Sequence, residues 1–153
     1  MAVMKDLLSV LIVSMTPVME LRASIPLGVA LEMDIYTALI ISILGNIFPS
    51  FFLIPLTGKV FDLLKGKSKF IDNFISKLEK KAESKFHIIE KYKKIGLIIL
   101  IAIPLPGTGV WTGCLVASML NMKLKDSVVP VILGTIIAAI IVTSITYGVT
   151  IFF

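Results

Sequence analysis

The chain has 153 residues, of which 57% are hydrophobic and 16% are charged, and its formal net charge is +5. A mean hydropathy of +1.00 leaves too little polar surface to cover a soluble domain of this size, which excludes a water-soluble globular fold. The single cysteine, Cys114, excludes an intrachain disulfide and a cysteine-based metal site. We therefore expect an all-α integral membrane protein, one domain over residues 1–153, with no cofactor and no bound metal.

Residues 1–34 are predicted to form a broken helical hairpin. Their apolar stretches, 7–19 and 23–31, are shorter than the ~20 residues that a membrane-spanning helix needs. Pro26 removes a backbone donor and Gly28 permits non-helical conformations, so we expect the helix to break here. Ser24 would then cap the short helix that starts directly after it.

Two longer apolar stretches, residues 35–58 and 123–153, are predicted to cross the membrane as helices. The lysine-rich residues 59–94 carry apolar residues at helical spacing. We expect them to form an amphipathic helix on the cytoplasmic surface, because loops rich in lysine stay in the cytoplasm. Membrane lipids, and not nucleic acid, are the expected partners of this helix.

Residues 95–122 are predicted to form a second broken hairpin. The stretch is long enough to span a bilayer, but Pro104, Pro106, Gly107 and Gly109 lie at its centre and disfavour a continuous helix. Backbone that leaves the helix inside a bilayer must be protected by protein or by a wet cavity, so each break predicts a polar site. The alternative is that both broken regions are kinked helices that cross the bilayer.

The distribution of lysines favours re-entrant hairpins over kinked spanning helices. With re-entrant hairpins, the basic residues 59–94 share the cytoplasmic face with Lys123 and Lys125, and Lys5 alone lies on the other face. The kinked-helix alternative moves Lys123 and Lys125 to the outside, which is a weaker partition of positive charge.

The two halves of the chain also predict an inverted repeat. Residues 31–33 align without gaps on residues 120–122, and residues 43–46 on residues 132–135. Each half then consists of a hairpin, a short polar turn and a spanning helix. Because one spanning helix separates the hairpins, the second is expected to enter from the opposite face.

Glu20 and Arg22 are the first candidate functional residues, because charges inside a membrane are costly and mark transport pathways. Two positions apart on a helix, their side chains point to nearly opposite sides, so each needs its own partner. Arg22 would engage an anionic group, and Glu20 would carry a proton or balance Arg22. The alternative is an ion pair that only stabilises an extended hairpin tip.

The second hairpin supplies further polar candidates. Thr108 is expected to cap a half-helix that contains Trp111 and Thr112. Its N-terminus would converge with the helix after Ser24 beside Arg22, and two helix N-termini next to an arginine form an anion site. Trp111 is expected either to stack on a substrate or to pack at an interface.

Small and polar residues of the spanning helices complete the candidate site. Asn46 and Thr135 occupy matching positions in the two halves and are expected to line the cavity or to hydrogen-bond between helices. The pairs Gly109 with Gly113, and Gly134 with Ala138, are expected to be structural, because small residues at this spacing let helices pack closely.

Three motifs resemble the small multidrug export protein family over nearly the whole chain: Glu20-Leu21-Arg22, Pro26-Leu27-Gly28, and PLPGTGVWTG at residues 104–113. That family is similar in plan to DedA and VTT-domain membrane proteins, which are associated with opposed re-entrant hairpins and with the movement of lipids. The resemblance implies that Glu20, Arg22, Pro26 and the prolines and glycines of residues 104–109 frame the central site. DedA proteins typically place further arginines in the second hairpin, and this chain lacks them there.

The leading functional hypothesis is a transporter in the inner membrane of a prokaryote that couples protons to an amphipathic anion, such as a lipid phosphate carrier. A homodimer is expected to help enclose the cavity. One alternative is an exporter of lipophilic cations, in which Glu20 binds substrate and proton in turn. The other is a scaffold that moves nothing. Catalysis is not expected, because the sequence shows no nucleophile with a base, no histidine-rich metal set and no phosphate-binding loop.

Overall fold

The computed structural model describes residues 2–64, 73, 76, 77, 93–105, 107–120 and 122–152. Within these ranges the chain forms helices and turns and no strand, which confirms the expected all-α class. Pro106 and most of the amphipathic helix expected at residues 59–94 lie outside the described residues. The helices are α1 (Ala2–Met15), α2 (Glu20–Ala30), α3 (Ile35–Ile47), α4 (Ser50–Leu64), α6 (Lys93–Ala102), α7 (Val110–Met119) and α8 (Leu124–Phe152).

Two helical segments are long and apolar enough to cross a membrane. The first runs for 23 residues from Ile35 to Thr57, through α3 and into α4, and it is interrupted only at Phe48 and Pro49. The second runs for 25 residues within α8. Both exceed the ~20 residues that a bilayer requires, and both coincide with the stretches predicted to span.

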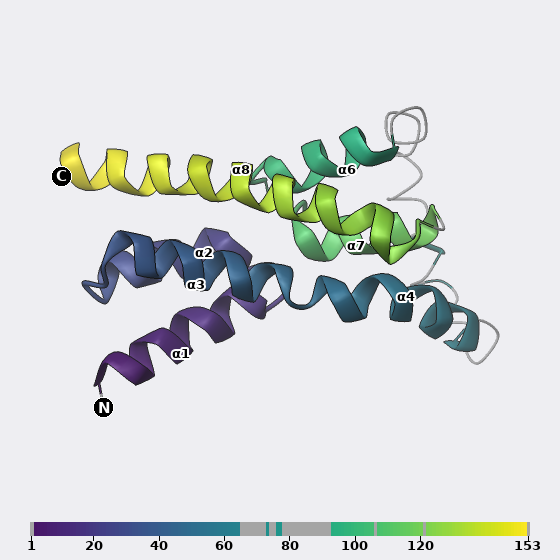
Figure 1. Ribbon diagram of the computed structural model, residues 1–153, viewed down its shortest axis with the longest axis horizontal. Helices are drawn as coiled ribbons and strands as arrows, with labels where there is room; N and C mark the ends of the chain where they lie inside the picture. Colours follow the sequence, from purple (N-terminus) through teal and green to yellow (C-terminus); the bar gives the residue numbers. More distant parts are fainter. Residues whose placement is uncertain are drawn as a thin grey trace.

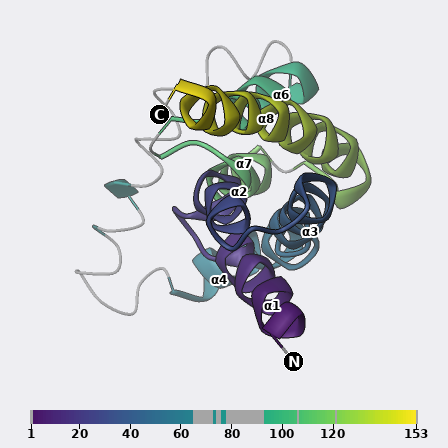
Figure 2. The same ribbon diagram turned by 90° about the vertical axis from the view of Figure 1, so that its left-hand side faces the viewer.

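The helices form two antiparallel pairs and two long rods (Figure 1). The pair α1 and α2 starts from the end of the molecule that holds both termini and turns near the middle, whereas α6 and α7 start from the other end and also turn near the middle. The connected helices α3 and α4 form one rod that runs the length of the molecule, and α8 forms the other. In the end-on view of Figure 2, α2 and α7 occupy the centre of the bundle.

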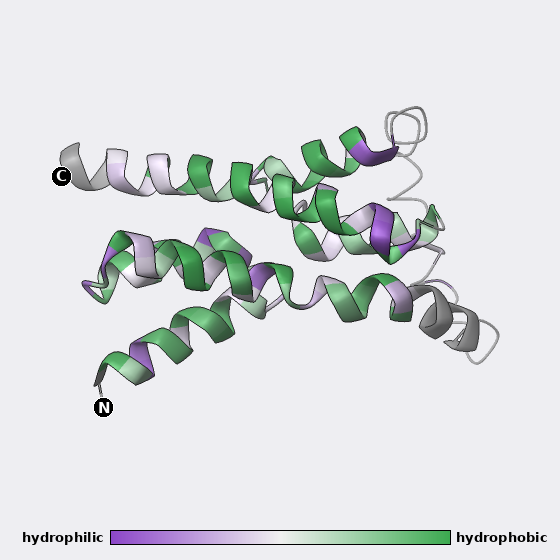
Figure 3. Cartoon of the chain, viewed as in Figure 1, coloured by the Kyte–Doolittle hydropathy of each residue, from purple (hydrophilic) through white to green (hydrophobic). Residues whose placement is uncertain are grey.

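The outer faces of the long rods are apolar, which is the surface that a lipid environment requires. Figure 3 shows hydrophobic residues along much of α3 and α8 and in the coloured part of α4, and hydrophilic ones where α6 and α8 begin. Large exposed apolar side chains recur along these helices: Ile40, Leu44, Phe48, Phe52 and Leu56 on one rod, and Val129, Leu133, Ile136 and Ile140 on the other.

Glycines let each pair of helices lie close against its rod. A Cβ added at Gly134 of α8 would come within 2.7 Å of the Ile101 Cβ atom of α6 and 3.0 Å of the Ile98 carbonyl. Gly45 of α3 faces α1 in the same way, since a Cβ there would overlap the Ser14 hydroxyl. The expected structural use of Gly134 is therefore confirmed.

Replacing Gly134 with Val is expected to lower the free energy of unfolding by about 1–3 kcal/mol, because the added side chain must push α6 away from α8. The matched control is Gly148→Val in the same helix, where an added Cβ meets nothing within 4 Å. Thermal unfolding of both variants in detergent, followed by circular dichroism, measures the difference. Equal stability of the two variants would contradict the close packing of α6 on α8.

The break in the first hairpin was predicted at the wrong place. Helix α2 begins at Glu20 and continues through Pro26 and Gly28 to Ala30. The chain turns instead at residues 16–19, which include Pro17, and Val18 adopts a φ of 74°. Gly28 serves packing, because a Cβ there would lie 2.6 Å from the Cβ atom of Ala38 in α3.

Candidate site where the two hairpin turns meet

The turn of the first hairpin contacts the turn of the second near the middle of the molecule. The first turn joins α1 to α2 over residues 16–19, and the second joins α6 to α7 over residues 103–109. Pro104, Gly107 and Gly109 lie in the second turn, with φ values of 82° at Gly107 and 112° at Gly109. Five hydrogen bonds that involve side chains connect the two regions across sequence separations of 86 to 96 residues.

The Glu20 carboxylate occupies the N-terminus of α7. It is only 3% exposed, and it accepts hydrogen bonds from the backbone amides of Val110 at 3.3 Å and Trp111 at 3.1 Å. These are the first two amides of the helix, which have no partner within it, and the partial positive charge of a helix N-terminus favours a carboxylate there. Glu20 therefore caps α7 from another part of the chain.

Gly109 makes room for this carboxylate. It precedes the first residue of α7 with φ 112° and ψ −168°, a conformation that is essentially restricted to glycine. A Cβ at this position would overlap both oxygens of the Glu20 carboxylate. Glycine is required at position 109 by backbone conformation and by space together.

Arg22 binds the second turn directly. Its guanidinium donates to the Thr108 carbonyl at 2.8 Å and to the Thr108 hydroxyl oxygen at 2.9 Å. That hydroxyl also accepts from the Leu105 amide at 3.2 Å and lies 2.6 Å from the carbonyls of Ile103 and Leu105, to which it can donate. Arg22 thus contacts both the backbone and the side chain of the threonine whose hydroxyl stabilises the turn.

Trp111 connects the second hairpin to the first helix. Its indole nitrogen donates to the Met15 carbonyl at 3.2 Å, and Met15 is the last residue of α1, where carbonyls lack helical partners. This contact places Trp111 between two elements of the fold, and its stacking on a substrate stays a prediction. Thr112 follows in the first turn of α7 and is half-buried.

Two expected helix caps are corrected by the structure. Ser24 lies inside α2 and does not begin a helix, because α2 starts four residues earlier. Thr108 is not the cap of α7, since Gly109 holds that position and the carboxylate comes from Glu20. The expected convergence of two helix N-termini is therefore not observed, and the carboxyl group of Glu20 occupies the N-terminus of α7.

Buried oxygen atoms lie in the helices around this site. The hydroxyls of Ser24, Ser42 and Thr135 and the side-chain carbonyl of Asn46 are buried and make no hydrogen bond to the described part of the protein. Asn46 Oδ1 and Thr135 Oγ1 therefore do not join helices through hydrogen bonds, and their role as cavity-lining residues stays a prediction. Ser24 and Ser42 lie one helical turn from the contact between Gly28 and Ala38.

A family model described as "Putative small multi-drug export protein" matches residues 20–141. The chain belongs to this family. The match covers Glu20, Arg22, Thr108 and Trp111, so the whole contact between Glu20 and α7 lies inside the family region. No curated protein and no solved structure matches the chain. Family membership and the two apolar spans together identify a membrane protein of an export family.

Proposed function

We propose that this member of the export family is a proton-coupled transporter of an amphipathic anion, with Glu20 as the proton-binding group and Arg22 as the group that engages the substrate. The observation that carries the proposal is the Glu20 carboxylate on the first amides of α7, with Arg22 on the adjacent turn. The carboxylate of Glu20 thus occupies a helix N-terminus, which is a position where other anions also bind favourably.

The proposed cycle exchanges one anion for another. A proton on Glu20 removes the charge that the α7 amides attract, so the hydrogen bonds from Val110 and Trp111 weaken. The helix N-terminus and Arg22 are then a local positive region that favours the anionic group of a substrate. Loss of the proton restores the carboxylate and expels the substrate, which couples the two movements.

The arrangement of the helices supports two hairpins that enter the bilayer from opposite faces as an inverted repeat. In the register that aligns Leu31 with Leu120, each of these residues follows the end of a short helix. The Leu31 amide donates a hydrogen bond to the Leu27 carbonyl at 3.0 Å, and the Leu120 amide donates one to the Val116 carbonyl at 3.0 Å. The next turns also correspond. The Met33 amide donates a hydrogen bond to the Gly28 carbonyl at 3.0 Å, and the Met122 amide donates one to the Ala117 carbonyl at 2.9 Å.

The same register extends to the hairpin turns and to the glycines of the rods. It aligns Val18, with φ 74°, on Gly107, with φ 82°, and it aligns Glu20, with φ 47°, on Gly109. It also aligns Gly45 with Gly134, which both face the first helix of their own hairpin. In this arrangement the basic segment between the halves lies in the cytoplasm.

The second candidate is an exporter of lipophilic cations, which the description of the family favours. In that case a cation and a proton would compete for Glu20, and Arg22 would hold the carboxylate between cycles. The electrostatic field at the site favours an anionic substrate, because Arg22 and the α7 N-terminus would repel a cation that approaches Glu20.

Transport by purified protein in liposomes distinguishes the two candidates. With an imposed proton gradient, we expect uptake of fluorescently labelled dodecyl phosphate, and no uptake of tetraphenylphosphonium beyond that of protein-free liposomes. Arg22→Gln should lower uptake of the phosphate by about 5- to 150-fold, the range of a coupling free energy of ~1–3 kcal/mol.

The control variant Thr108→Val removes the hydroxyl that Arg22 contacts and keeps the arginine charge. If Arg22 only stabilised the turn, Thr108→Val and Arg22→Gln would lower uptake alike. The anion proposal requires the loss to be much larger for Arg22→Gln, and uptake of the phosphate that is unchanged in Arg22→Gln would overturn it.

A further inference from the structure

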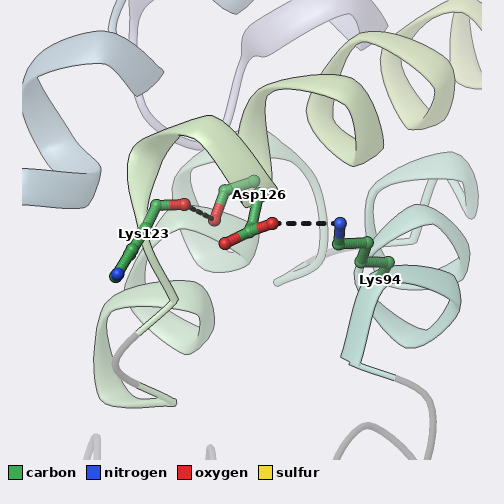
Figure 4. Close-up of polar contacts among 4 residues, drawn as sticks. Lys94, Lys123 and Asp126 are labelled. Atoms are coloured by element: carbon green, nitrogen blue, oxygen red, sulfur yellow. Dashed lines mark hydrogen bonds and ion pairs between the residues drawn. The ribbon is translucent and has the colours of Figure 1, made fainter.

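A basic pocket lies at the end of the molecule where α6 and α8 begin, away from the contact between the hairpin turns. Its volume is about 260 Å³, and it is lined by Lys93, Lys94, Leu120, Met122, Lys123 and Asp126. In Figure 4, Asp126 lies between Lys123 and Lys94 and points its carboxylate at the Lys94 ammonium group. Lys123 meets Asp126 only through its backbone carbonyl, which accepts from the Asp126 amide at 2.9 Å. The lining thus carries three lysines and one carboxylate, so the pocket is positively charged.

The ion pair in this pocket is open to exchange. Lys94 Nζ lies 3.0 Å from Asp126 Oδ1, and the two side chains are 61% and 50% exposed. Ion pairs between such exposed groups are weak and are screened by salt. An incoming anion with several oxygen atoms can therefore take Lys94 from Asp126, in a pocket that Lys93 and the flexible side chain of Lys123 also line.

The surroundings of the pocket are apolar on one side. Leu120 and Met122 contribute to its lining, and the apolar span of α8 begins at Leu124. Ile95, which follows Lys94 in α6, and Val129, three residues after Asp126 in α8, are 55% and 59% exposed. Positive charge next to exposed apolar side chains of the same helices matches a molecule with an anionic head and an acyl tail.

We propose that this pocket binds the phosphate headgroup of an anionic phospholipid, whose acyl chains lie along the exposed apolar side chains of α6 and α8. The proposal requires that α8 crosses the bilayer, and it does not depend on the substrate or on the chemistry of Glu20. It assigns Lys94 and Lys123 to lipid binding and Asp126 to competition with the lipid phosphate for Lys94.

The test is a titration of the detergent-purified full chain with phosphatidylglycerol, with phosphatidylcholine and with inorganic phosphate, read by native mass spectrometry. Lys94→Gln and Lys123→Gln should each weaken phosphatidylglycerol binding by about fivefold. Asp126→Asn should strengthen it by a similar factor, because the competing carboxylate is gone. The matched control is Lys125→Gln, an exposed lysine of the same helix that does not line the pocket, which should change little.

Stability separates lipid binding from a structural ion pair. Lys94→Gln and Asp126→Asn break the same contact between α6 and α8, so their thermal unfolding without lipid should shift alike, while their lipid affinities should move in opposite directions. Equal effects of Lys94→Gln, Lys123→Gln and Lys125→Gln on lipid affinity would overturn the proposal. Inorganic phosphate binding as tightly as phosphatidylglycerol would also overturn it, since the free ion would then be the occupant.

Discussion

Glu20→Gln is expected to lower strongly the accumulation of an anionic amphipath that is driven by a proton gradient. Glutamine keeps the shape of the side chain and one oxygen that can accept from the Val110 or Trp111 amide, but it carries no charge and binds no proton. The α7 N-terminus then remains in the state that the protonated protein adopts. Gradient-driven uptake of labelled dodecyl phosphate should fall by about 5- to 150-fold, as expected for loss of a coupling free energy of ~1–3 kcal/mol.

Exchange without a gradient is the internal control for this variant. Liposomes preloaded with unlabelled dodecyl phosphate should still exchange it for labelled substrate, because Arg22 and the α7 amides are intact. Loss of both activities, with unfolding at the temperature of the wild type, would place Glu20 in substrate binding instead of coupling. Gradient-driven uptake at the wild-type rate would show that Glu20 carries no coupled proton.

The long elements were predictable from the sequence because they depend on composition and length. Apolar runs of sufficient length at residues 35–58 and 123–153 gave the two rods, and Pro104, Gly107 and Gly109 indicated the turn between α6 and α7. Membership of the export family, which was expected from the motifs around Glu20 and Pro104, is confirmed. These features are local, so each can be recognised without knowing what packs against it.

The position of the first turn was predicted wrongly because Pro26 and Gly28 were both interpreted as helix breaks, whatever their place in the helix. Pro26 is tolerated inside α2, while Pro17 marks the turn, and Val18 adopts a positive φ there although a β-branched residue rarely does. The proposed repeat offered a signal for this turn, since the sequence register that aligns Leu31 with Leu120 places Pro17 opposite Pro106. Residue type alone therefore does not decide whether a helix breaks at Pro26 or Gly28.

The partners of the charged residues were not predictable at all. Glu20 and Arg22 were identified as costly inside a membrane, but the sequence does not show that Glu20 meets amides 90 and 91 residues away. A capping pattern is normally searched within a few residues of the helix start, where Thr108 was the natural choice. Contacts between distant turns are a property of packing, and the structure was needed to find them.

Gly109→Ala is expected to be the most damaging single-methyl substitution at the site. A non-glycine residue at φ 112° and ψ −168° costs about 1–3 kcal/mol in backbone strain, and the new Cβ would also overlap the Glu20 carboxylate. The carboxylate must then leave the Val110 and Trp111 amides. We expect reduced stability in thermal unfolding and loss of phosphate uptake, whereas Gly148→Ala, where an added Cβ meets nothing within 4 Å, should lower neither.

A double-mutant cycle separates the strain at Gly109 from its contact with Glu20. In a Glu20→Ala background the overlap is absent, so Gly109→Ala should cost less than in the wild type, by the ~0.5–3 kcal/mol typical of residues in contact. The backbone strain persists in both backgrounds and sets the remaining cost. If Gly109→Ala costs the same with and without the Glu20 carboxylate, the two residues are not coupled, and the capping of α7 by Glu20 on which the proposed exchange depends is wrong.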